Sequence, residues 1–148
     1  MPHPDSGFRG YVGLDVISSG EGQAVVRLLA EDRHLNPHGA VHGGALATLA
    51  DAAMGTAVAT LTDGRPVTIE MKVTFLEPGR PGLLIARART RKPGRRITIV
   101  EVEISQSAEP PDDPDGTAAG ISTASDRLEG QDADEVVAHA IATFTTLD

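Results

Sequence analysis

The stretch NPHGAVHGG, residues 36–44, decides the fold of this chain, together with the apolar run that follows it to about residue 61. From residue 43 to residue 62 every side chain is apolar, small or a hydroxyl, with the single exception of Asp51. Pro37 and Gly39 turn the chain before this run, because neither residue continues a helix easily. The run from His42 onward therefore predicts a helix of about 18 residues that carries two glycines at its start.

This predicted helix offers two groups that a reaction can use. Its first turn exposes N–H groups and a partial positive charge, and Gly43 and Gly44 let a ligand oxygen approach those N–H groups closely. Asp51 is the second group, because an isolated carboxylate is expensive to bury and is therefore either paired or used. The stretch thus combines an oxyanion-binding helix end with a single carboxylate.

The composition bounds the class of protein. A chain of 148 residues that is 40% hydrophobic can form a real core, and we expect one domain over residues 1–148. The formal net charge of -8 argues against nonspecific nucleic-acid binding, and the absence of cysteine excludes disulfides and thiol catalysis. Residues 40–61 have the length of a membrane span, but their Ala, Gly and Thr content and Asp51 favour a buried core helix. Residues 1–10 do not resemble a signal peptide, so we expect a cytoplasmic protein.

Alternating apolar and polar residues predict strands on both sides of the helix. Two strands are expected before it and four after it, at residues 11–18, 23–30, 67–75, 83–91, 97–105 and 136–145. In the clearest strand, one apolar face is predicted to carry Val67, Ile69, Met71, Val73 and Phe75. Thr68 is then expected on the opposite, polar face of that strand.

The remaining segments complete the predicted fold. Residues 108–133 contain several Pro, Asp, Gly and Ser residues and are expected to form a loop or flexible insertion. Glu101 and Glu103 can face the arginines of strand 83–91 across the sheet, and the last strand reads as a buried central one. Antiparallel strands with one helix that is apolar nearly all round predict an α+β fold in which the sheet curls around the helix.

The order Asn36, Gly39 and His42-Gly43-Gly44, followed by Asp51 inside the helix, resembles the PaaI-like hotdog-fold thioesterases of the phenylacetate-pathway and THEM-type group. The resemblance covers about residues 10–107 and 134–147. It implies a hotdog fold, a curved antiparallel sheet wrapped around one long central helix. It also implies a homodimer or a tetramer of dimers that hydrolyses an acyl-CoA or acyl-carrier thioester without a cofactor.

The same resemblance implies a role for each motif residue. The backbone N–H of Gly43 would hold the thioester carbonyl oxygen, while His42 and Asn36 would shape that pocket. Asp51 would be the general base or the nucleophile. Thr68, at the position of the family's hydroxyl residue, would assist the carboxylate or the water.

The resemblance also implies where the substrate lies. Relatives hold CoA against segments that match the loop at residues 75–80 and the turn at residues 92–96. The expected substrate contacts are Gly44, Phe75, Pro78, Arg80, Lys92, Arg95 and Arg96. The acyl group is expected in a pocket lined by helix residues around Ala47, Ala50 and Met54 and by residues from the neighbouring chain, and the small side chains there favour a medium or aromatic acyl group.

The spacing of the two main candidates has a consequence for assembly. Thioester hydrolysis needs a place for the developing oxyanion and a base or nucleophile, which Gly43 and Asp51 supply. Eight residues of helix separate them by roughly 12 Å along the axis, too far to act on one carbonyl within one chain. Two copies with antiparallel helices would bring Asp51 of one to Gly43 of the other. If both act together, the site is shared between subunits.

Simpler roles stay open for the same residues. Asp51 can be a structural hydrogen-bond acceptor, His42 a helix cap and Asn36 a turn residue. Thr68 can be an ordinary strand residue, and Arg95 and Arg96 can be solvated surface.

The sequence also bears on three other functions: a metal site, a binding module without catalysis and a hydratase. His34, His38 and His42 recur every four residues, but the Pro and Gly between them break the helix that would align three ligands, so no metal is expected. A hotdog module that binds an acyl-CoA-like ligand without hydrolysing it is the main alternative, and Asp51 argues against it. The Asp/His pattern expected of a hotdog hydratase is not visible.

Overall fold

The computed structural model describes residues 7–107 and 134–148. Its elements, in chain order, are α1 (Phe8–Val12), β1 (Leu14–Gly20), β2 (Gln23–Ala30), the short 3-10 helix η1 (Asp32–His34), α2 (Gly43–Ala59), β3 (Arg65–Phe75), β4 (Gly82–Lys92), β5 (Thr98–Gln106) and β6 (Glu135–Leu147). The predicted insertion at residues 108–133 lies outside the described residues.

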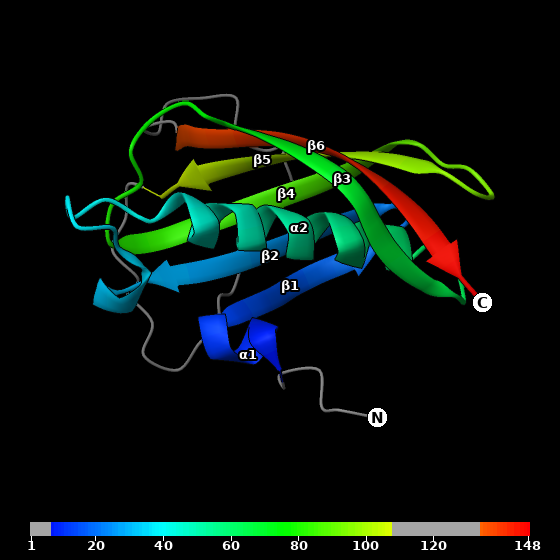
Figure 1. The fold of residues 1–148 in the computed structure, drawn as a ribbon, viewed down its shortest axis with the longest axis horizontal. Helices are drawn as coiled ribbons and strands as arrows, with labels where there is room; N and C mark the ends of the chain where they lie inside the picture. The colour runs from blue at the N-terminus through cyan, green and yellow to red at the C-terminus, as the bar shows by residue number, and fades with distance from the viewer. Residues whose placement is uncertain (1–6, 108–133) are drawn as a thin grey trace.

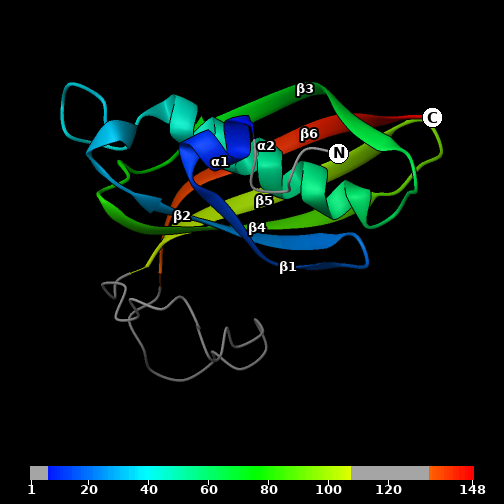
Figure 2. The same ribbon diagram turned by 90° about the horizontal axis from the view of Figure 1, so that it is seen from below.

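The six strands form one antiparallel sheet in the order β1-β2-β4-β5-β6-β3. The long helix α2 runs across one face of the sheet (Figure 1). Figure 2 shows the sheet curving around this helix, with β1 and β3 at its two edges. The predicted α+β architecture, a sheet curled around one long helix, is therefore confirmed.

The predicted elements match the observed ones closely, with one exception at the N-terminus. A strand was expected from residue 11, but residues 8–12 form α1 and β1 begins at Leu14. Gly13 separates the two in a left-handed conformation (φ 87°) that glycine adopts without a steric penalty. The expected cross-strand charge match is present in the register of β4 with β5, where Arg87 lies opposite Glu103 and Arg89 opposite Glu101.

The core lies between α2 and the concave face of the sheet. One face of the helix is buried there, formed by Leu46, Leu49, Ala50, Ala53, Met54, Ala57 and Val58. The opposite face is only half-buried and carries small side chains, among them Ala47, Asp51 and Gly55. The sheet therefore does not enclose the helix all round. Because Ala50 and Met54 are fully buried in this core, their predicted place in an acyl pocket is wrong.

Strand β3 departs from the predicted alternation because it contains a β-bulge. Its register with β6 shifts between Thr68 and Glu70, so Ile69 is an extra residue. Because of the extra residue, the side chains that precede the bulge lie on the opposite faces of the sheet from those predicted. Val67 and Ile69 are 42% and 53% exposed. The prediction that both belong to the apolar face with Met71 is therefore wrong. Thr68 turns inward toward α2 instead of outward.

Among the described helices, none combines the length and the apolar character that crossing a membrane requires.

Candidate active site

The loop before α2 is closed by the side chain of Asn36. Its Oδ1 accepts hydrogen bonds from the backbone N–H groups of His38 at 2.9 Å and Ala40 at 3.1 Å. Its backbone N–H donates to the Ala40 carbonyl at 2.7 Å. The amide oxygen of Asn36 is thus used to shape the loop, as expected of a turn residue. A direct role of Asn36 toward a substrate carbonyl stays a prediction.

Two consecutive N–H groups of the motif are bound from different parts of the chain. The Val41 N–H donates to the carbonyl of Gly79, in the loop between β3 and β4, at 2.8 Å. The His42 N–H donates to the carbonyl of His34, at the end of η1, at 2.7 Å. The entry into α2 is therefore fixed by two separate loops.

The first turn of α2 leaves one N–H group without an acceptor. His42 is the N-cap, and its Nδ1 accepts from the Gly44 N–H at 2.8 Å, while its carbonyl accepts from Ala45 at 2.9 Å. Within the described part of the chain, the N–H of Gly43 has no hydrogen-bond acceptor. In the first turn of α2, the Gly43 N–H is therefore the free donor, at a position where the partial positive charge favours an anion. The Gly44 N–H, in contrast, is already occupied.

Phe75 lies directly against Gly43. A Cβ atom at residue 43 would lie 3.1 Å from the Cζ atom of the Phe75 ring, a tighter contact than side chains normally make. Phe75 ends β3 and is 53% exposed, so its ring is an apolar wall beside the free donor. The absence of a side chain at Gly43 keeps that donor approachable.

Asp51 and Thr68 form the second half of the site. The Thr68 hydroxyl donates to Asp51 Oδ1 at 2.6 Å, a length typical of a hydrogen bond to a carboxylate. This contact depends on the bulge at Ile69, which turns Thr68 toward α2. Asp51 is half-buried, and among the described residues it forms no ion pair. One carboxylate oxygen is thus held by a neutral hydroxyl and the other is left for chemistry.

The structure does not bring these two halves together within one chain. Gly43 is the first residue of α2 and Asp51 lies eight residues further along the same helix. The axial separation of roughly 12 Å that the sequence indicates therefore holds for the folded protomer.

The expected substrate contacts also fall into two groups, at opposite ends of α2 (Figure 1). Phe75, Pro78 and Arg80 lie near its N-terminal end, and Arg80 pairs with Glu135 at 3.1 Å. The turn that carries Lys92, Arg95 and Arg96 lies beyond its C-terminal end, and all three side chains are exposed.

A cavity of about 450 Å³ opens beside the turn between β4 and β5. It is lined by Val58, Leu61, Thr62, Pro93, Gly94, Arg95, Thr98 and Thr146. Arg95 therefore borders a hollow at the far end of the helix from Gly43. In a single protomer, an atom bound at Gly43 would therefore lie far from this turn.

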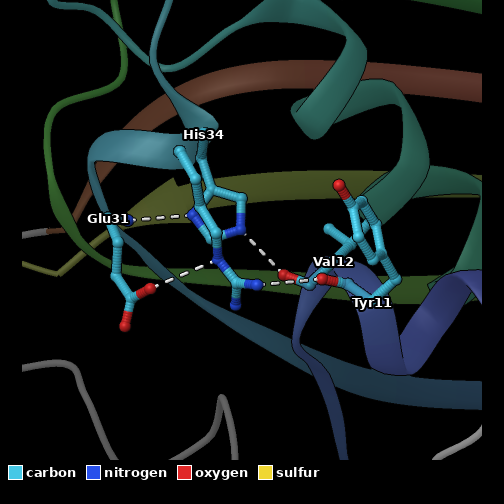
Figure 3. Close-up of polar contacts among 5 residues, drawn as sticks. Tyr11, Val12, Glu31 and His34 are labelled. Atoms are coloured by element: carbon cyan, nitrogen blue, oxygen red, sulfur yellow. Dashed lines mark hydrogen bonds and ion pairs between the residues drawn. The ribbon is translucent and has the colours of Figure 1, made fainter.

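His34, considered above only as a metal ligand, is a buried structural residue (Figure 3). Its Nδ1 accepts from the Glu31 N–H at 2.9 Å, so its Nε2 carries the proton and donates to the carbonyl of Val12 at 2.8 Å. Beside it, the guanidinium of Arg33 donates to the Tyr11 carbonyl at 3.0 Å. Both ring nitrogens of His34 are occupied, and the described residues contain no group of three metal-ligating side chains.

Comparisons with known proteins agree with this fold. The sequence profile of the thioesterase superfamily matches residues 38–110. The acyl-coenzyme A thioesterase PaaI of Escherichia coli is 38% identical over 95 residues, which cover 63% of this chain and 66% of that protein. A conserved protein of Pseudomonas aeruginosa shares the fold with a TM-score of 0.76 and 30% identity, over 96% of this chain and 94% of that one. The structure of the E. coli PaaI protein superposes with a TM-score of 0.74 and 26% identity, over 95% and 83% of the two chains.

Proposed function

Because the chain belongs to the PaaI-like hotdog thioesterases of the thioesterase superfamily, we propose that it hydrolyses acyl-CoA thioesters to the free acid and CoA. The observation that carries the proposal is the free N–H of Gly43 at the start of α2, combined with the hydroxyl-held carboxylate of Asp51. These are the donor and the carboxylate that thioester hydrolysis needs.

The Gly43 N–H binds the thioester carbonyl oxygen and stabilises the negative charge that develops there. The helix dipole adds to this effect, and the Phe75 ring limits access of water to the oxygen. Asp51 then acts in one of two ways. As a general base it takes a proton from a water that attacks the carbonyl carbon. As a nucleophile it forms an acyl-enzyme anhydride that water opens. In both cases the C–S bond breaks and the CoA thiolate leaves, taking up a proton.

The site is shared between two subunits in a homodimer, and two such dimers can assemble into a homotetramer. An antiparallel arrangement of two α2 helices brings Asp51 of one protomer toward Gly43 of the other. The half-buried face of α2 supports this, because its small side chains allow another helix to approach closely. The edge strand β3 also supports it, since Val67 and Ile69 expose apolar surface beside unpaired backbone groups.

The same arrangement unites the two groups of expected substrate contacts. The C-terminal end of one α2 then lies near the N-terminal end of the other, so Arg95 and Arg96 of one subunit face Arg80 of its partner. Cations from both chains would meet the CoA phosphates, which Arg binds well through paired N–H donors.

The direct test is hydrolysis of a panel of short, long and aromatic acyl-CoA substrates, followed by release of free thiol. We expect turnover by the wild type and a loss of about 10²–10⁴-fold in kcat for Asp51→Asn, because the variant amide cannot act as base or nucleophile. A variant that kept most of its activity would overturn the role of Asp51. No turnover on any substrate, with CoA still bound, would favour a non-catalytic module that binds an acyl-CoA-like ligand.

A further inference from the structure

We infer that two buried polar side chains outside the motif, His34 and Gln106, are positioning residues that hold the Gly43 N–H in place for the reaction. The inference rests on the proposed function, because it assigns both residues to the oxyanion site. They act from different sides of the motif, through the N–H groups of Val41 and His42.

Gln106 holds one side. It is 4% exposed at the end of β5, and its amide binds both backbone groups of Arg80. Oε1 accepts from the Arg80 N–H at 2.7 Å, and Nε2 donates to the Arg80 carbonyl at 3.1 Å. The preceding residue, Gly79, is buried and accepts the Val41 N–H at 2.8 Å. A Cβ atom at Gly79 would lie only 3.1 Å from the Cβ of Val41, so the two backbones fit closely.

His34 holds the other side. Its ring is fixed between the Glu31 N–H and the Val12 carbonyl, which joins η1 to the end of α1 (Figure 3). With the ring fixed at both nitrogens, the backbone carbonyl of His34 has a defined position. That carbonyl accepts the His42 N–H at 2.7 Å.

Gly43 follows directly after these two anchored residues. His42 has an extended backbone (φ -61°, ψ 135°), so a shift of either anchor moves the next N–H group with it. A displacement of about 1 Å at a reacting group costs up to about 10²-fold in rate. Because the oxyanion forms only during the reaction, loss of an anchor lowers kcat more than it raises KM.

The first test replaces the glutamine by a side chain of similar length without an amide. We expect Gln106→Met to lower kcat about 10–100-fold while KM changes by less than about threefold. Ser105→Ala is the matched control, because Ser105 is equally buried in the same strand but binds Arg87 on β4 instead of the loop. An unchanged kcat in Gln106→Met, or an equal loss in Ser105→Ala, would overturn the inference.

A second variant separates positioning from simple stability. In Gln106→Glu, an ionised carboxylate would accept from the Arg80 N–H but place its second oxygen against the Arg80 carbonyl. The protonated acid can donate to that carbonyl as the amide does. The Arg80 guanidinium is paired at 3.1 Å with the carboxylate of Glu135, which lies opposite Gln106 in the register of β5 with β6.

The ratio of variant to wild-type kcat is therefore expected to rise toward one as the pH falls from about 8 to about 5.5, because burial favours the neutral acid. Taking the ratio at each pH removes any pH dependence of kcat that both proteins share. A ratio that does not depend on pH contradicts the proposal that the Gln106 amide holds the Arg80 backbone in place.

The His34 side is tested with two variants. His34→Asn retains an acceptor near the position of Nδ1 for the Glu31 N–H, but loses the donor to Val12. His34→Ala loses both bonds. We expect kcat to fall in the order wild type, His34→Asn, His34→Ala, with KM nearly constant. Wild-type kcat in both variants would exclude a positioning role for His34.

The amide resonance of Gly43 in the ligand-free protein gives a readout that needs no turnover. It is expected to shift in Gln106→Met and His34→Ala, and to stay in place in Ser105→Ala. If the wild type hydrolyses no thioester, the proposed function fails. The resonance still tests whether Gln106 and His34 fix the position of the Gly43 N–H. If the wild type is active and both kcat and the resonance are unchanged in the variants, the positioning role of Gln106 and His34 is wrong, while the proposed function stands.

Discussion

The two ends of α2 are built differently. At the N-terminal end the backbone N–H groups around the motif are bound to Gly79, His34 and the cap residue His42, and only Gly43 is left free. At the C-terminal end the helix stops beside an open cavity of about 450 Å³ with exposed arginines on the neighbouring turn. One end is a fixed donor site, and the other is an open cationic site.

The difference between the ends teaches how the site is divided. The rigid end suits a reaction, since a preorganised donor needs no rearrangement when charge develops. The open cationic end suits a large anionic group that binds and leaves. Asp51 lies between these ends, eight residues or roughly 12 Å along the helix from Gly43, so one protomer does not bring its carboxylate to a carbonyl held by its own Gly43. The comparison therefore supports the proposal that two protomers complete each other.

After the loss of Asp51, the largest expected effect comes from removing the free donor. Gly43→Pro deletes the N–H at the first position of the helix, where proline fits well and the preceding His42 already has a compatible extended backbone. We expect kcat to fall about 10²–10³-fold, as for the loss of an oxyanion donor. Steady-state kinetics on an acyl-CoA substrate measures this.

Gly43→Ala is the matched control for that variant. It adds a Cβ against the Phe75 ring but keeps the N–H group. Because Phe75 is half exposed and can move, we expect at most about a tenfold loss. Equal losses in the Ala and Pro variants would mean that the side chain, and not the donor, matters at this position.

A smaller effect is expected midway along the helix. Thr68→Val removes the hydroxyl that binds Asp51 and preserves the shape of the side chain. We expect kcat to fall about tenfold, in line with the loss of one hydrogen bond to a charged group, with KM unchanged. Thr68→Ser should retain nearly full activity, because it keeps the hydroxyl. If Thr68→Val is as active as the wild type, Thr68 is only a strand residue.

The smallest effect is expected at the cationic end. Arg95→Gln and Arg96→Gln should each raise KM for acyl-CoA about three- to tenfold with little change in kcat, and the difference should shrink at high salt. Arg91→Gln is the control, because Arg91 is paired with Glu101 at 2.7 Å and is not expected to reach the substrate. A KM effect no larger than that of the control would leave Arg95 and Arg96 as solvated surface.

The sequence was informative wherever local pattern decides structure. The apolar run, the preceding turn and the alternating segments predicted α2 and the strands within a few residues, because period and turn chemistry are local properties. The face of β3 on which the Thr68 side chain lies was not predictable in this way. It depends on the bulge at Ile69, which exists only in the register of β3 with β6.

The two anchors of the motif were missed for a related reason. Gln106 stands at the end of an ordinary strand, and no local signal indicates that its amide reaches Arg80, 26 residues earlier in the chain. His34 was noticed only for its spacing with two other histidines. A buried polar side chain is selected by partners that are distant in sequence, so its role becomes visible only in the folded chain.

The shared site is the central claim, and mixed dimers test it most directly. Asp51→Asn and Gly43→Pro subunits are unfolded together in equal amounts and refolded, with each variant and the wild type refolded alone as controls. A mixed dimer contains one site with an intact Gly43 and an intact Asp51 from different chains, and one site that lacks both. Random pairing in a two-fold dimer then restores about one quarter of the wild-type activity. Activity in the mixture no higher than that of the two variants alone would contradict the claim and place both groups of each working site in one chain.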